Sequence, residues 1–305
     1  MSADGGGVPR PAAPQIDVVR SLGRKLRIGG IDSLDSRPLL EGLRPVLGDG
    51  FDLEVHVPSE LAGKLRAGAF DVALAPVPEY FTGRKDYRIV PGVSISSYGA
   101  IESVCLFHRK PLAGVERIAI DSSSVAGGLL ARLLFAKEWT SGGPGRRFET
   151  VSPEDAEAAI ETGNPAFDAV LLEGDPALEA GILAESSGEW RSVDLGTEWT
   201  RITGLPFVCA FWVTGGPAIP GLSAALQRAR DLGRARIDEI VEAGPLPRGL
   251  AKAAARRHLY QVIRHELGAI QIDGLLEFRR RAAGLESLAG FREDLLFLEG
   301  AEKPS

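Results

Sequence analysis

Between residues 26 and 80, short apolar stretches alternate with amphipathic ones, and this alternation constrains the fold more than any other feature of the chain. Residues 28–31, 52–57 and 70–75 have the composition of strands, whereas residues 39–47 and 58–67 have the apolar spacing of helices. A strand–helix–strand–helix–strand order is typical of a largely parallel sheet covered by helices. The chain is therefore expected to adopt an α/β fold.

A second unit of the same kind begins near residue 117. Its predicted strands are residues 117–121 and 167–172, with helices at 125–139 and 153–162. Residues 88–95 and 101–108 are expected to be strands and 76–80 a loop, while the apolar strand 205–214 could return the chain to the first unit. From residue 219 to about 298 the pattern is helical, with breaks near Gly244 and Gly268.

These units predict two lobes around a cleft. Residues 25–110 and 214–305 are assigned to lobe 1, residues 111–213 to lobe 2, and residues 1–24, rich in Gly, Pro and Ala, to a flexible tail. Polar residues follow several predicted strands, and open α/β sheets bind ligands at the carboxyl ends of their strands. A small-molecule site between the lobes is therefore expected.

The polar corner after the first strand holds Asp32, Ser33, Asp35 and Ser36, and Pro38 suits the first turn of a helix. Taken alone, this corner could be an ordinary helix cap, in which Asp35 or Ser36 bonds the amides of the first turn. Its place beside other polar strand ends favours a wall of the cleft instead. The other polar strand ends are residues 76–79 and 96–103 of the first unit and 121–124 and 174–175 of the second.

Composition narrows the class of function. The chain has 305 residues and a net charge of −6, so it lacks the basic field of a nucleic-acid-binding protein. Cys105 and Cys209 lie in apolar runs and are expected to be buried, reduced thiols. The histidines have no metal-binding spacing, and no glycine-rich nucleotide loop follows a strand, so neither a metal nor an organic cofactor is expected. His258 and His265 are expected at solvent or interface positions.

No signal sequence and no 18-residue apolar run is present, which favours a cytoplasmic protein without membrane contact. The oligomeric state is left open by the sequence.

Several runs resemble one known family: residues 28–39, 68–80, 94–107, 174–178 and 194–207. Together they are similar to the chorismate dehydratase family, MqnA, of the futalosine route to menaquinone, from about residue 26 to 285. The resemblance implies a two-lobed periplasmic-binding-protein-like type II fold with a central cleft and a helical C-terminal segment. It also implies a lyase without cofactor, which removes water from chorismate to give 3-[(1-carboxyvinyl)oxy]benzoate.

The resemblance also implies two catalytic residues. Ser103 matches a family serine near the reacting ring, and Asp35 stands where the family usually has asparagine. Asparagine both donates and accepts hydrogen bonds, whereas an ionised aspartate only accepts. The two substrate carboxylates would need hydrogen-bond donors from the polar corners. The candidate binding residues are Ser33, Ser36, Ser97, Gly99, Ser122, Ser123, Ser124, Gly174 and Asp175.

Three hypotheses follow for the substituted position. A chorismate dehydratase could keep Asp35 protonated, in the role of the asparagine, through burial and the charge of the substrate. A diverged enzyme could use an ionised Asp35 as a general base on chorismate or a related enolpyruvyl compound, for instance to release pyruvate by hydrolysis. A non-catalytic protein could bind a small carboxylate in the same cleft, which the fold supports only by analogy.

Overall fold

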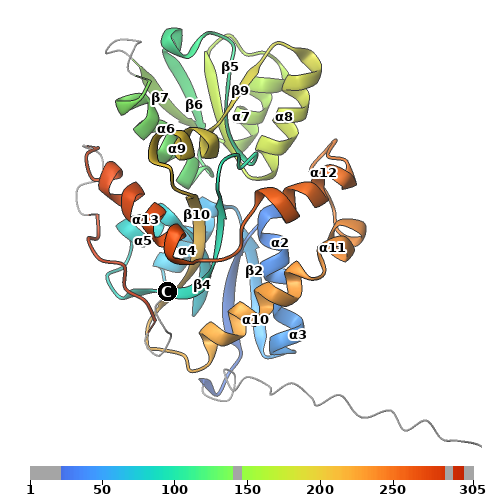
Figure 1. The fold of residues 1–305 in the computed structure, drawn as a ribbon, viewed down its shortest axis with the longest axis vertical. Coiled ribbons are helices and arrows are strands. Elements are labelled where there is room, and N and C mark those ends of the chain that lie inside the picture. The colour runs from blue at the N-terminus through green and yellow to red at the C-terminus, as the bar shows by residue number, and fades with distance from the viewer. Residues whose placement is uncertain (1–21, 140–145, 286–290, 299–305) are drawn as a thin grey trace, which may run out of the picture.

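The computed structural model describes residues 22–139, 146–285 and 291–298, and contains two five-stranded sheets in two stacked lobes (Figure 1). The first sheet has the order β2-β1-β3-β10-β4. Its parallel strands β1, β2 and β3 confirm the alternation that begins the sequence, and β10 is antiparallel to both β3 and β4. The bounds are β1 Leu26–Ile31, β2 Phe51–His56, β3 Val72–Pro76, β4 Tyr87–Ser97 and β10 Phe207–Gly215.

The second sheet repeats this plan with the order β7-β6-β8-β5-β9. Strand β6 is parallel to β7 and β8, whereas β5 is antiparallel to β8 and β9. The bounds are β5 Val104–His108, β6 Arg117–Asp121, β7 Arg147–Val151, β8 Ala169–Glu173 and β9 Arg191–Asp194. Two parallel-strand units, each with an antiparallel strand arriving from the other lobe, give the periplasmic-binding-protein-like architecture.

Helices cover the sheets of both lobes (Figure 1). Those of the first lobe are η1 Leu34–Ser36, α2 Arg37–Glu41, α3 Leu43–Leu47, α4 Pro58–Arg66, α5 Val77–Thr82, α10 Leu222–Arg234, α11 Ile237–Ala243, α12 Lys252–Arg257, η4 His258–Val262 and α13 Ala269–Ala282. Those of the second lobe are η2 Leu112–Gly114, α6 Val125–Lys137, α7 Pro153–Glu161, α8 Asp175–Ser187 and α9 Leu195–Thr203. No helix in the described part of the chain has the length and apolar character needed to cross a membrane.

The predicted lobe boundaries misplace strand β5 and cut through strand β10. Strand β5 lies in the second sheet although residues up to 110 were assigned to lobe 1, and β10 lies in the first sheet although residues up to 213 were assigned to lobe 2. Each strand joins the sheet in which its backbone finds pairing partners, which composition does not reveal. We propose that the chain crosses between the lobes at residues 98–103 and 204–206.

Other predicted elements also differ. Residues 39–47 form parts of two short helices, α2 and α3, which meet at Gly42. A Cβ at Gly42 would lie 1.8 Å from the carbonyl oxygen of Ala229, so glycine permits α10 to approach at this point. Residues 77–82 are helical rather than a loop, with Pro78 in the first turn.

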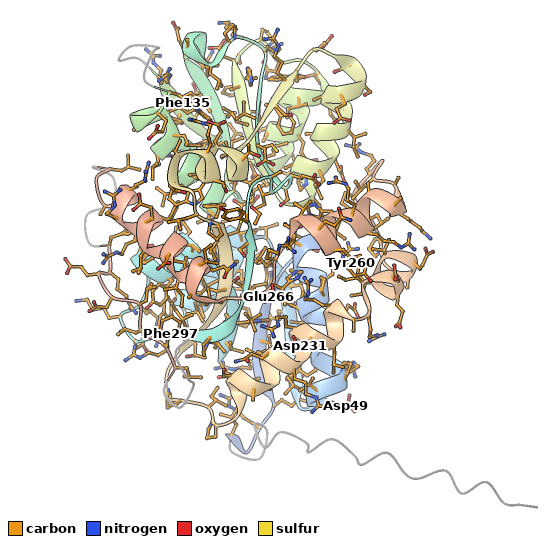
Figure 2. All side chains as sticks on the ribbon, in the orientation of Figure 1. Asp49, Phe135, Asp231, Tyr260, Glu266 and Phe297 are labelled. Carbon is orange, nitrogen blue, oxygen red and sulfur yellow. The ribbon has the colours of Figure 1, made fainter. Side chains whose placement is uncertain are left out.

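The C-terminal part is less helical than its pattern predicts, because a π-helical turn, η4, and an extended stretch separate α12 from α13. In Figure 2 the labelled Tyr260 and Glu266 mark this segment, which runs from the flank of the first lobe towards its centre. Both cysteines are free and buried, as their apolar neighbours predict. Most of the predicted flexible tail, residues 1–24, lies outside the described residues.

Candidate active site

A cavity of about 150 Å³ is lined by the strand ends of both lobes. Residues after β1, with Pro76 and Ala210, line it from the first sheet, while Glu173 and the residues after it line it from the second. Ser103, the residue immediately before β5, lines it at the crossover between the lobes. The volume is below the roughly 300–1,000 Å³ of typical ligand pockets, so the lobes are closely apposed.

Six of the eleven candidate residues line this cavity, namely Ser33, Asp35, Ser103, Ser123, Gly174 and Asp175. The other five do not: Ser36, Ser97, Gly99, Ser122 and Ser124. Ser36 Oγ donates to the carbonyl of Ile31 at 2.6 Å, so it closes its own turn. Ser124 Oγ donates to Asp121 at 3.0 Å, and Ser122 is exposed.

Asp35 and Ser103 are 68 residues apart in sequence and touch in the structure. The hydroxyl of Ser103 donates to Asp35 Oδ2 at 2.6 Å, and both residues are buried. Ser33, the residue before η1, makes no capping hydrogen bond through its side chain. The carboxylate of Asp35 contacts Ser103 at the crossover and does not bond the amides of its own helix. The cap interpretation of this corner is therefore wrong for Asp35.

Two residues of this site were missed by sequence reasoning, which placed His258 and His265 at solvent or interface positions. Both are buried and both contact Asp35. His258 Nε2 lies 2.6 Å from Asp35 Oδ1, and His265 Nε2 lies 2.7 Å from the backbone carbonyl of Asp35. The only sequence signal was the pair of histidines in one C-terminal segment, since the contact itself spans more than 200 residues.

Glu102 completes the group behind Asp35. Its Oε2 lies 3.1 Å from His258 Nδ1, and its Oε1 is 2.7 Å from Arg257. The hydrogen bond from His258 and the ion pair with Arg257 lower the pKa of Glu102 to about 2. Asp35, His258, Glu102 and Arg257 therefore form a chain of alternating charge that runs from the cavity to the surface.

Among the described residues that line the cavity, five have carboxyl side chains and none has a basic side chain. The five are Asp32, Asp35, Glu157, Glu173 and Asp175. Burial, together with the charges of Asp121 and Asp35, raises the pKa of Glu173 to about 7. Burial and the charge of Asp35 also raise the pKa of Asp175 to about 6. Near neutral pH the cavity can therefore present protonated carboxyl groups, which donate hydrogen bonds, beside ionised ones.

The backbone amides expected to bind a substrate carboxylate are partly occupied. The amide of Gly127, in the first turn of α6, donates to Glu173 Oε2 at 3.0 Å. The amide of Leu34 donates to Asp175 Oδ1 at 2.7 Å, a contact that joins the first corner of lobe 1 to the start of α8 in lobe 2. Asp175 therefore holds the lobes together in this state of the cleft.

In chemical terms the site offers the carboxylate of Asp35 with the hydroxyl of Ser103 beside it and His258 behind it. It also offers Glu173, a second carboxyl group with a raised pKa. Such a set can move a proton to and from a small molecule. Across the described residues, no group of three or more His, Cys, Asp or Glu side chains is arranged to hold a metal ion.

Comparisons with known proteins agree with this architecture. The profile of a family described as "Menaquinone biosynthesis" matches residues 26–284. A chorismate dehydratase of Thermus thermophilus is 30% identical over 231 residues, which cover 71% of this chain and 82% of that protein.

Two solved structures have the same fold at low sequence identity. A protein of Archaeoglobus fulgidus is similar with a TM-score of 0.67 and 16% identity over 85% of this chain and 97% of its own. The alkanesulfonate-binding protein of Xanthomonas axonopodis pv. citri has a TM-score of 0.62 and 14% identity over 90% of this chain and 96% of its own. The fold is that of the periplasmic binding proteins. By the family profile and the curated relative, the chain belongs to the menaquinone biosynthesis family that includes the chorismate dehydratases, MqnA.

Proposed function

We propose that this protein is a chorismate dehydratase, which removes water from chorismate to give 3-[(1-carboxyvinyl)oxy]benzoate in menaquinone biosynthesis. The observation that carries the proposal is the 2.6 Å contact between Ser103 and Asp35 at the cavity wall. These are the two positions at which the family resemblance expects catalytic side chains, and folding brings them together from opposite ends of the first unit.

The reaction suits a site of this composition. Loss of the ring hydroxyl and a neighbouring ring proton makes the ring aromatic, so the substrate itself supplies much of the driving force. The protein must hold the ring in a reactive geometry and help the proton and the hydroxyl leave. Carboxyl and hydroxyl groups in a small, closed cleft are suited to both tasks, because excluding water strengthens their interactions with the substrate.

The acidic lining favours a second candidate, a diverged reaction on chorismate or a related enolpyruvyl compound. A substrate with two carboxylates would meet five acidic side chains in this cavity. Protonated Glu173 and Asp175 could donate to those carboxylates, while the same acidic groups could instead protonate an enolpyruvyl group and release pyruvate by hydrolysis. A non-catalytic binder of a small carboxylate is the third possibility, since one of the two compared structures is an alkanesulfonate-binding protein.

One incubation separates the three. Purified protein is mixed with chorismate, and the products are identified by mass spectrometry, with pyruvate followed in parallel. A product lighter by one water supports the dehydratase. Pyruvate together with a dihydroxycyclohexadiene carboxylate, the two hydrolysis products of chorismate, supports the diverged enzyme and contradicts the proposal. Unchanged chorismate with measurable binding by calorimetry supports the binder and also contradicts it.

Ser103→Ala tests whether the observed activity belongs to this site. Removal of the hydroxyl leaves Asp35 Oδ2 without its partner at 2.6 Å, and we expect kcat to fall by about 100-fold or more. Ser122→Ala is the matched control, because Ser122 is exposed and does not line the cavity. Equal loss in both variants, or none in Ser103→Ala, would place the activity elsewhere.

A further inference from the structure

The segment between α12 and α13 gives Asp35 two histidine partners that differ in protonation. His265 Nε2 donates to the carbonyl of Asp35 at 2.7 Å, while His265 Nδ1 accepts from Arg234 at 3.0 Å. One donor and one acceptor describe a neutral imidazole. Burial lowers the pKa of His265 to about 4, in agreement with this assignment. His265 therefore holds the backbone of Asp35 without adding charge.

His258 has a different set of partners, because both of its ring nitrogens face carboxylate oxygens. Nε2 lies 2.6 Å from Asp35 Oδ1 and Nδ1 lies 3.1 Å from Glu102 Oε2. A neutral imidazole has one N–H and would direct the lone pair of its other nitrogen at a carboxylate, whereas an imidazolium donates at both positions. The geometry is therefore that of a charged histidine. Burial by itself would lower the pKa of His258, but Asp35 and Glu102 outweigh it and raise that pKa to about 9.

The surroundings of His258 are built to keep this arrangement. The charged groups that face it are Asp35 from η1 and Glu102 from the crossover, with Arg257 beyond Glu102. Glu102 has φ of +62°, the single positive φ of a non-glycine residue among the described residues. Its amide donates to Asp194 at 2.6 Å, which holds the turn in this unfavourable conformation. Strain of this kind persists where neighbouring contacts enforce it, and it is enriched at functional sites.

We propose that His258 is a positioning residue of the active site: as an imidazolium it holds the Asp35 carboxylate beside Ser103, in the place from which Asp35 takes a proton from the substrate. The inference rests on the proposed function, because it concerns a proton removed from a small enolpyruvyl carboxylate in this cavity. It deepens that function by assigning the base to the protein, with Asp35 ionised and not protonated as the first hypothesis for a dehydratase had it. It also adds His258, a residue that does not line the cavity, to the residues that serve the reaction.

In the proposed dehydration, two bonds of the substrate break and one ring double bond forms. The proton on the ring carbon passes to Asp35, and the electron pair of that C–H bond becomes a ring double bond. The C–O bond to the neighbouring hydroxyl breaks, and the leaving oxygen takes a proton from the carboxyl group of Glu173 to depart as water. Asp35 is then protonated and Glu173 ionised, and exchange of one proton through solvent restores both.

The charge of His258 can be measured without any substrate. In the full-length protein, ¹⁵N-histidine NMR follows the four imidazole rings from pH 5 to 10, and His258→Gln identifies the resonances of His258. We expect the ring to stay an imidazolium through neutral pH and to lose its proton near pH 9. Asp35→Asn should lower the pKa of His258 by at least one pH unit, because it removes the closer carboxylate. Asp175→Asn, the matched control, removes a cavity carboxyl that has no contact with His258. A wild-type His258 that is neutral at pH 7, or an unchanged pKa in Asp35→Asn, would overturn the proposal.

Kinetics then test the role. His258→Gln keeps one hydrogen-bond donor and removes the charge, and we expect kcat to fall roughly 10- to 100-fold with little change in KM. The wild-type loss of kcat above pH 9 should be absent from this variant, a change that a purely structural role would not produce. Asp35→Asn should lower kcat at least 100-fold. Since asparagine is the usual family residue, an Asp35→Asn protein that retains the wild-type rate would show that no carboxylate base is needed and would refute the assignment.

The two proposals fail in different ways. If chorismate is not converted by the wild-type protein but His258 is an imidazolium coupled to Asp35, the dehydratase assignment is wrong and the charged His258–Asp35 pair is confirmed. If chorismate is converted to the dehydrated product while His258 is neutral at pH 7, the proposed role of His258 is wrong and the dehydratase assignment is confirmed. If His258→Gln does not fold, the wild-type titration and Asp35→Asn still decide the question.

Discussion

Replacing Glu173 by glutamine should make the protein more stable at pH 8 and leave its stability at pH 4.5 unchanged. Glu173 is partly buried at the end of β8, accepts from the amide of Gly127 at 3.0 Å and lies near the charges of Asp121 and Asp35. Burial and these charges raise its pKa from 4.5 to about 7. The glutamine has the same shape, and its carbonyl oxygen can still accept from Gly127.

The magnitude follows from the difference in proton affinity between the folded and unfolded chains. Because the folded protein binds this proton more tightly, the free energy of unfolding falls as pH rises from 4.5 to about 7, and the cost is complete above that range. At about 1.4 kcal/mol per pH unit the cost approaches roughly 3 kcal/mol. Solvent screening of a partly exposed group reduces it to about 2 kcal/mol. Glu173→Gln should recover this amount at pH 8.

Urea unfolding followed by circular dichroism at pH 4.5, 6, 7 and 8 measures the effect. The difference between variant and wild type should increase with pH and level off above pH 7. Glu185→Gln on α8 is the matched control, since Glu185 is exposed and its replacement should give a pH-independent difference. The reasoning is refuted if Glu173→Gln shows the same free-energy difference at pH 4.5 and pH 8. The same variant should lose kcat, because the amide cannot supply the proton that the leaving oxygen takes.

Two further predictions concern the scaffold of the site. Asp194→Asn should lower the free energy of unfolding by about 1–2 kcal/mol and should lower kcat more than it changes KM. The reason is that the carboxylate accepts from the amides of Ile101, Glu102 and Thr197 and fixes the turn before Ser103. Thermal unfolding and initial rates measure the two effects, and unchanged rates would contradict the prediction. Gly233→Ala should cost about 3 kcal/mol, because the added Cβ would lie 1.6 Å from the carbonyl oxygen of Pro38. Gly181→Ala, in open space on α8, should instead stabilise by about 0.5–1 kcal/mol, and equal effects in urea unfolding would contradict the packing argument.

The alternation of apolar strands and amphipathic helices was sufficient to predict an α/β chain with two units, because it depends on local periodicity alone. Residues such as Asp35, Ser103 and Asp175 were also predicted at the cavity, because polar groups at strand ends stand out against apolar strands. The short strands β7 and β9 were not predicted, since none of their residues is fully buried and they carry no apolar alternation.

The sheet to which β5 and β10 belong, and the charge state of the site, were decided only by tertiary structure. Each of these strands lies between two neighbours of its sheet, and composition does not reveal which neighbours a strand will pair with. His258 comes from 223 residues beyond Asp35, and its proton depends on two carboxylates that folding places at its two nitrogens. A sequence shows which groups can ionise, whereas burial and neighbouring charge decide which of them do.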